Sequence, residues 1–281
     1  MNFLKTTILL AALTGLLVAV GGFIGGTGGA IVLLILAGIM NFFAYWFSDR
    51  VALAMAGARQ VTEADAPRLF AIVREVARAA GMPMPRVYIV ENASPNAFAT
   101  GRDPKHAVVA VTTGILRLLD ERELRAVIGH EMGHVKNRDI LTSSIVATIA
   151  GAISMIAQVL MFTSLFGGGD RDRNPLAALA VILLAPIAAT LLQLGISRSR
   201  EYAADETGAR VTRDPLALAS ALEKLKMGIA AMPMEPTPAQ EAVSALYIAN
   251  PFRGEGLANL FSTHPPLDER IRRLRNMAGR I

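Results

Sequence analysis

The sequence His130-Glu131-Met132-Gly133-His134 decides how this chain is organised. It lies in a stretch whose apolar residues recur at helical spacing, so both imidazoles share one helix face and can bind one Zn²⁺. Glu131 follows the first imidazole and is placed to act as a general base. The alternative is a fortuitous pair of histidines on a solvated helix face. The chain has only four histidines, which makes such a coincidence rare.

A catalytic zinc site needs a third protein ligand and an open position for water. A third histidine would have to be His106 or His264, and a carboxylate is the other option, for which Glu201 is the best candidate. Glu201 and Asp205 are four residues apart and face one direction on a helix. Asp205 is therefore a candidate to hold a ligand histidine in place. An ordinary surface pair of acids is the alternative for these two residues.

The longest uncharged stretch runs from Thr6 to Phe47. As one helix, at about 1.5 Å per residue, it would be about twice as long as a bilayer core is thick. We therefore expect a break in the glycine cluster at residues 21–29, with one membrane helix before it and a second from about Ala30. A cleaved signal peptide is the alternative for the first helix, because Lys5 precedes an apolar run.

Two more uncharged stretches, residues 141–169 and 175–197, are each long enough to cross a bilayer once. The short polar linker between them predicts a helical hairpin, which gives four spans in all. In such an arrangement the other side of the membrane has only Arg171 and Arg173, offset by two acids. The remaining basic residues that flank the spans lie on one side: Lys5, Arg50, Arg59, Lys136, Arg138, Arg198 and Arg200. The positive-inside rule then places both termini and both polar segments in the cytoplasm.

The polar segments differ in their predicted structure. Residues 48–140 read as a compact α/β unit, and residues 198–281 read as mainly helical. The expected elements are a helix at 63–79, a strand at 86–90, a hairpin of 96–100 with 106–112, and helices at 121–137, 198–211, 215–226 and 267–277. In the last helix, Ile271 and Leu274 are expected to face inward and Arg270 to lie elsewhere.

Composition agrees with a membrane protein. Hydrophobic residues make up 53% of the chain and charged residues 18%, against about 25% charged in an ordinary soluble domain. The net charge of +5 is too mild and dispersed to argue for nucleic acid. The absence of cysteine excludes disulfides, thiolate metal ligands and a cysteine nucleophile.

The predicted fold class is mainly α with a small β-sheet. The chain is expected to be a four-span integral membrane protein that carries a cytoplasmic zincin-like domain. The expected parts are two membrane helices at 1–47, the α/β part at 48–140, a membrane hairpin at 141–197 and a helical part at 198–281. His134 lies about 10 Å of helix before the third span, and Glu201 lies just after the fourth. The hairpin would therefore bring both residues together at the cytoplasmic surface.

Four segments together resemble the HtpX family of bacterial membrane zinc metalloproteases, which are relatives of the Ste-type CAAX prenyl endopeptidases. They are residues 96–101, 130–134, 198–205 and 263–271. The resemblance covers essentially the whole chain, including the four spans. It implies an endopeptidase of the bacterial inner membrane that hydrolyses misfolded or damaged membrane proteins at the cytoplasmic face. It also implies one Zn²⁺ per chain held by His130, His134 and Glu201, with Glu131 as catalytic base.

Two further assignments concern the substrate. His264 is a candidate donor to the oxyanion, and its alternative is a capping or packing histidine before the last helix. His106, at the start of a strand, reads as structural. An extended substrate is expected to pair with an edge strand, for which a plain hairpin strand is the alternative. The residues of that strand are Asn96, Ala97, Phe98 and Ala99.

The expected partners are polypeptides and the lipid bilayer, with no nucleic acid and no oligomeric state indicated. One alternative function is a prenyl-protein processing endopeptidase with the same chemistry. Four spans are too few to enclose the large chamber that such an enzyme would need. A second alternative function is that of a scaffold or transporter with an incidental metal site. No span contains an ionisable residue of the kind that usually marks a transport pathway.

Overall fold

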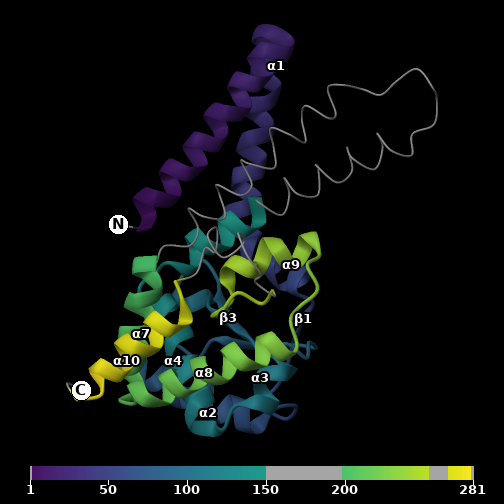
Figure 1. The fold of residues 1–281 in the computed structure, drawn as a ribbon. Coiled ribbons are helices and arrows are strands. Elements are labelled where there is room, and N and C mark those ends of the chain that lie inside the picture. Colours follow the sequence, from purple (N-terminus) through teal and green to yellow (C-terminus); the bar gives the residue numbers. More distant parts are fainter. Residues whose placement is uncertain (1, 150–197, 253–264, 280–281) are drawn as a thin grey trace.

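The computed structural model describes residues 2–149, 198–252 and 265–279. Figure 1 shows a long pair of helical arms standing on a body of helices around a small sheet. The expected fourth span, most of the third and His264 lie outside the described residues. The parts that position the candidate site are all described.

Helix α1 (Asn2–Ala56) reverses its direction at Gly26, where φ is +59°. Glycine adopts this left-handed conformation without steric cost. The Asn41 side-chain amide donates to Thr14 Oγ1 at 2.9 Å and to the Leu10 carbonyl at 3.4 Å, so the two arms lie side by side (Figure 1). The reversal falls inside the glycine cluster where the sequence predicts a break.

The second arm of α1, Gly26–Ala56, is the one helix in the described part of the chain that is long and apolar enough to cross a bilayer. It does not end at Phe47 as expected but continues to Ala56. Ala52 and Leu53 are buried against the sheet. One continuous helix therefore joins the apolar arm to the body.

The sheet has four strands in the order β1-β2-β4-β3. The pairs β1–β2 and β3–β4 are antiparallel, and β2–β4 is parallel. The strands are β1 (Ala58–Gln60), β2 (Arg86–Val90), β3 (Ala97–Thr100) and β4 (Val108–Thr112). The strand at 86–90 and the hairpin of β3 with β4 are as the sequence predicts. Strand β1 was not predicted, because its residues Ala-Arg-Gln carry no apolar alternation.

Both faces of the sheet are buried, as the alternation of side chains along β4 shows. Val109 and Val111 join the larger core with the helices on one face. Val108 and Ala110 point to the other face, where the end of α1 and Tyr247 cover them. A strand covered on both sides must be apolar throughout, which explains the continuous run of β4.

The helices of the body include five that lie close to the predicted ranges and two short ones, at 113–118 and 238–243, that were not predicted. They are α2 (Pro67–Ala80), α3 (Thr113–Leu118), α4 (Glu121–Lys136), α7 (Arg198–Thr212), α8 (Pro215–Ala231), α9 (Pro238–Val243) and α10 (Leu267–Met277). Helix α4 lies at the centre and contacts α2, α7, α8 and β3. A capping box of Asp120 and Glu123 fixes where α4 begins. An apolar helix at Ile140–Ile149 follows its end.

Helix α10 shows one clear departure from the sequence prediction. Ile271 and Leu274 face the core as expected. Arg270, which was expected elsewhere, is 0% exposed. A guanidinium is buried only when it is paired, and its partners lie in the candidate site.

Candidate metal centre

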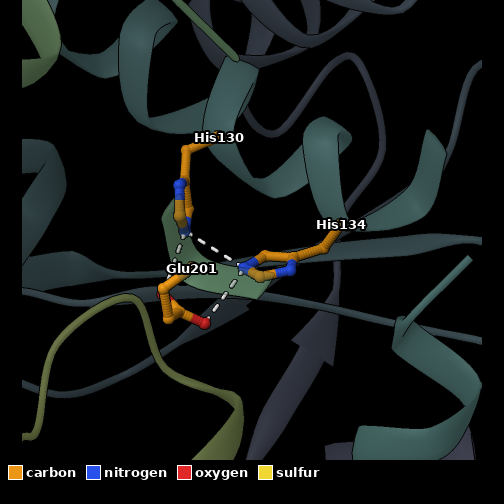
Figure 2. A group of neighbouring side chains, drawn as sticks. All are labelled: His130, His134 and Glu201. Atoms are coloured by element: carbon orange, nitrogen blue, oxygen red, sulfur yellow. Dashed lines mark hydrogen bonds and ion pairs between the residues drawn. The ribbon is translucent and has the colours of Figure 1, made fainter. Parts of the chain in front are cut away.

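Two helices bring His130, His134 and Glu201 together, as Figure 2 shows. The Nε2 atoms of the two histidines, both on α4, lie 3.1 Å apart. From α7, Glu201 places Oε1 3.4 Å from His134 Nε2 and Oε2 3.6 Å from His130 Nε2. The three side chains therefore point at one common centre.

These distances suit a tetrahedral metal ion. Bonds of 2.0–2.1 Å to a central zinc separate neighbouring ligand atoms by about 3.3 Å, close to the spacings of this group. Two imidazole nitrogens and one carboxylate oxygen are also the donors of a hydrolytic zinc site, which leaves a fourth position open. The residues present therefore fit such an ion.

The outer ring nitrogen of each histidine is held by a carboxylate. His130 Nδ1 lies 2.9 Å from Asp205 Oδ1, and His134 Nδ1 lies 3.2 Å from Asp139 Oδ2. Because a carboxylate only accepts, both Nδ1 atoms donate, and each Nε2 lone pair faces the centre. Asp205 occupies the place that its spacing from Glu201 predicts. Asp139 was missed by sequence reasoning.

Asp139 reaches its histidine through an abrupt end of α4. Arg138 adopts a left-handed φ of 57°, and the Asp139 N–H then donates to the His134 carbonyl at 3.2 Å. This reversal folds the residue back under the helix that carries the motif. A residue after a helix end carries no periodic signal, so the sequence offered no way to assign it.

Small residues let α7 approach α4 closely enough to deliver Glu201. A Cβ on Gly208 would lie 2.6 Å from the His130 backbone nitrogen, and one on Gly133 would lie 2.9 Å from the Ala204 carbonyl oxygen. Such distances are far below ordinary van der Waals contact. The backbones of the two helices thus touch at the level of the metal-centre residues.

The electrostatic environment distinguishes the two histidines. Full burial, assisted by the charge of Arg270, lowers the pKa of His130. Burial also disfavours a charged His134, but Asp139 and Glu201 outweigh it and raise its pKa to about 10. The acidic surroundings therefore hold a positive charge at this position, and a bound cation would satisfy the same requirement.

Glu131 is 0% exposed, and burial raises its pKa to about 8. Neither of its carboxylate oxygens accepts a hydrogen bond of ordinary geometry from the described residues. The backbone N–H of Ala99 is directed toward the carboxylate and opposes the rise in pKa. A buried carboxylate without a structural partner is costly, which indicates a chemical role.

Arg270 is the main residue of this region that sequence reasoning misplaced. Its Nε and Nη2 donate to the two oxygens of Asp205 at 2.8 and 2.7 Å, and its Nη1 donates to the Ile248 carbonyl at 2.6 Å. Nη1 also lies 3.4 Å from Glu201 Oε2. Burial opposes ionisation of Asp205, but the Arg270 charge holds its pKa well below its usual range. Arg270 thus fixes the carboxylate that orients His130.

The strand expected to bind substrate is buried, and its most exposed residue, Ala99, is 5% exposed. The outward carbonyl of Ala97 accepts from the Ile248 N–H at 2.9 Å. The Asn96 amide donates to the Ala249 carbonyl at 2.8 Å. At these two residues the outer edge of β3 is therefore occupied by the protein itself.

The remaining two residues of that strand have different surroundings. Phe98 packs edge-on against Tyr247, with ring centroids 5.3 Å apart. The N–H of Ala99 is directed toward Glu131 instead. Ala99 therefore lies at the point where β3 reaches the metal centre.

Among the described residues, the remaining histidine, His106, does not join the group. His106 lies in the connection between β3 and β4, where its Nδ1 is 2.8 Å from Asp103 Oδ1 and its Nε2 is 2.7 Å from Arg102 Nη2. This arrangement agrees with a structural role. His264 lies outside the described residues, so its expected contact with an oxyanion remains a prediction.

Two imidazoles and a carboxylate around an open position, beside a buried glutamate, define the active site of a metalloprotease. The comparisons with known proteins agree. The sequence model of Peptidase family M48 matches residues 63–278, and the chain belongs to this family.

Similar proteins extend over nearly the whole chain. The chain is 54% identical over 280 residues to the Protease HtpX homolog of Burkholderia multivorans. The aligned residues make up 99% of this chain and 97% of the relative. A protein of the same description from Burkholderia mallei is 53% identical over the same length. The crystal structure of S. mikatae Ste24p matches 97% of this chain at 16% identity with a TM-score of 0.50. The chain spans 65% of the length of that protein, and the likeness shows the fold alone.

Proposed function

We propose that this chain is a zinc endopeptidase in which His130, His134 and Glu201 hold one Zn²⁺ and Glu131 is the catalytic base. The observation that carries the proposal is the convergence of the three donor atoms on one centre, with the unpartnered Glu131 carboxylate beside it. Asp205 and Asp139 hold the two histidines in the orientation that zinc requires.

In peptide hydrolysis, the metal ion and Glu131 have different roles. Zinc, when bound, supplies Lewis acidity toward a peptide carbonyl and toward water. Glu131 removes a proton from the attacking water and passes the proton to the nitrogen of the leaving amine. A carboxyl whose pKa burial has raised to about 8 can both accept and release a proton near neutral pH.

The substrate is proposed to lie extended along β3. Asn96 and Ala97 fix the strand to residues 248–249, so pairing with substrate starts at Ala99, beside Glu131. Contacts between main chains do not read side chains, which suits an enzyme of broad specificity. His264 is proposed as a donor to the developing oxyanion, because Pro265 and Pro266 hold the backbone after it rigid.

The proposed setting is the bacterial inner membrane, with four spans and the catalytic part and both termini in the cytoplasm. The apolar arm Gly26–Ala56 and the apolar helix Ile140–Ile149 support this topology, since both join the catalytic body directly. The proposed substrates are misfolded or damaged membrane proteins. The relatives bear the description Protease HtpX homolog, in agreement with a role in protein quality control.

The two alternative functions have less support. A scaffold or transporter with an incidental metal site is set aside because the chain belongs to a peptidase family. A prenyl-protein processing activity would rest on the likeness to Ste24p, which concerns the fold alone. No feature of the described residues favours it.

The proposal is tested by measuring zinc content and cleavage of an unfolded test protein with the full chain purified in detergent. We expect about one zinc per chain, and cleavage that a chelator stops and added zinc restores. If a well-folded preparation holds no zinc and cleaves nothing after zinc is added, the motif has been misread.

Replacing Asp139 with asparagine should weaken zinc binding by about 10- to 100-fold, because His134 would lose the carboxylate that orients it. Asp103→Asn is the matched control, since Asp103 also pairs with a histidine but lies outside the metal centre. Competition with a fluorescent zinc chelator measures both affinities. Equal affinities of the two variants would contradict the role given to Asp139.

A further inference from the structure

A cleft opens where the connection between β3 and β4 meets the ends of α2 and α4. Its volume is about 590 Å³, and none of the metal-centre residues lines it. Lys105 comes from the connection, and Lys136 and Arg138 come from the end of α4. The cleft is large enough for the headgroup of a phospholipid.

The cleft carries a net positive charge. The side chains of Lys105, Lys136 and Arg138 are exposed, and among the described residues none of them makes an ion pair or a hydrogen bond. The one acid of the lining, Asp103, accepts from the Lys105 N–H at 2.8 Å and lies 2.8 Å from His106 Nδ1. Its charge is therefore engaged locally, whereas the three cations are available to an anion.

Arg138 stands at a position that favours glycine. It is the left-handed residue that ends α4, with φ of 57° and its N–H donating to the Val135 carbonyl at 3.1 Å. Glycine takes this place in many helices because a side chain is disfavoured there. A cation at a helix end also interacts with the helix dipole, but Lys136 already provides that effect. The end of α4 therefore does not require the Arg138 side chain, which leaves its guanidinium free to bind an anion.

The cleft lies beside both apolar helices. Arg138 is followed almost at once by the apolar helix Ile140–Ile149. On the other side, the guanidinium of Arg102, next to Asp103, lies 4.8 Å from the ring centroid of Trp46 in the apolar arm of α1. Tryptophan and arginine commonly lie at the level of lipid headgroups.

We propose that this cleft binds the phosphate of an anionic membrane phospholipid. The ammonium groups of Lys105 and Lys136 and the guanidinium of Arg138 would donate to the phosphate oxygens. The acyl chains would extend along the neighbouring apolar helices. The position of the apolar helices beside the cleft favours a lipid over free phosphate. Only a lipid can contact both the basic cleft and these helices.

Trp46 is the single tryptophan of the chain and reports on lipids beside this cleft. The full chain is placed in bilayers of neutral lipid that contain brominated phosphatidylglycerol or brominated phosphatidylcholine at equal mole fraction. We expect the anionic lipid to quench Trp46 more strongly, with an apparent preference of roughly threefold or more. Equal quenching by the two lipids would overturn the proposal.

A matched pair of variants separates binding from structure. Arg138→Gly should bring the preference to about one without lowering the unfolding temperature, because glycine suits the left-handed conformation. Arg213→Gly is the control, since Arg213 is also exposed and left-handed, with φ of 55°, but lies after α7 and outside the cleft. The preference of Arg213→Gly for the anionic lipid should equal that of the unmodified chain. A preference that survives Arg138→Gly would contradict the assignment.

Inorganic phosphate distinguishes the two sources of the same anion. At an ionic strength matched with chloride, added phosphate should leave the preference for phosphatidylglycerol unchanged, because it lacks the contacts of the acyl chains. If phosphate abolishes the preference at millimolar concentration, the cleft is a site for free anions, and the lipid assignment is wrong.

Discussion

Glu131→Gln is expected to lower kcat/KM for peptide hydrolysis by at least about 10³-fold while zinc content and fold persist. An amide cannot take the proton of the attacking water. Glutamine should be tolerated at this buried position, because burial raises the pKa of Glu131 to about 8 and the neutral carboxyl resembles an amide in shape and charge. Glu131 is also outside the group of donor atoms that would hold zinc.

Cleavage, zinc content and unfolding temperature are measured on the same preparations of the unmodified chain and two variants. Glu206→Gln, at an exposed position of α7 paired with Arg210, controls for the substitution itself and should cleave normally. Retained cleavage by pure Glu131→Gln would refute the assignment of the catalytic base. Loss of zinc together with cleavage would show that Glu131 acts in metal binding instead.

Local patterns in the sequence predicted the parts of the fold that follow from periodicity. The strand at 86–90, the hairpin of β3 and β4, and the long helices of the body appear close to their expected ranges. The break in the N-terminal apolar stretch was also predictable, because bilayer thickness limits the length of a span. Strand β1 was missed because three residues without apolar alternation carry no such pattern.

The donor set of the candidate site was predictable because it depends on spacing within two helices. His130 and His134 share one face of α4, and Glu201 and Asp205 share one face of α7. The membrane hairpin expected at 141–197 then predicted that the ends of these two helices meet, and the likeness to a known family agreed with this pairing. The structure brings all four residues together, as expected.

The buried Arg270 shows where local reasoning fails. A helical pattern suggests that an arginine avoids the core, yet this residue lies on the buried face of α10 with Ile271 and Leu274. Its burial depends on Asp205, which is distant in sequence and neutralises its charge. A partnership of that kind is visible only once α7 and α10 are packed together.

The close contact of α4 with α7 left a weak signal. Gly129 and Gly133 are four residues apart on α4, and Ala204 and Gly208 are four apart on α7. Such spacing of small residues allows helices to approach closely. Together with the position of the motif, it would have predicted that the two helices meet at the metal centre.

Gly208→Ala is therefore expected to disrupt the site as strongly as the loss of a ligand. The new Cβ would lie 2.6 Å from the His130 nitrogen and 2.8 Å from its Cα, and backbone atoms cannot move aside cheaply. Overpacking of this kind costs about 1–3 kcal/mol. As α7 shifts away, Glu201 leaves the two histidines, and kcat/KM should fall by at least about 10²-fold with a loss of zinc.

Two other glycines give the expected order of effects. Gly129→Ala should be milder, because its nearest neighbour at 2.6 Å is the Thr212 side chain, which can rotate at the expense of one hydrogen bond. Gly38→Ala, in open space on α1, should leave zinc binding unchanged. Within a helix, alanine is more favourable than glycine by about 1 kcal/mol. A lower free energy of unfolding in Gly208→Ala would therefore come from the clash alone. Normal zinc affinity in Gly208→Ala would show that the close approach of the helices does not position Glu201.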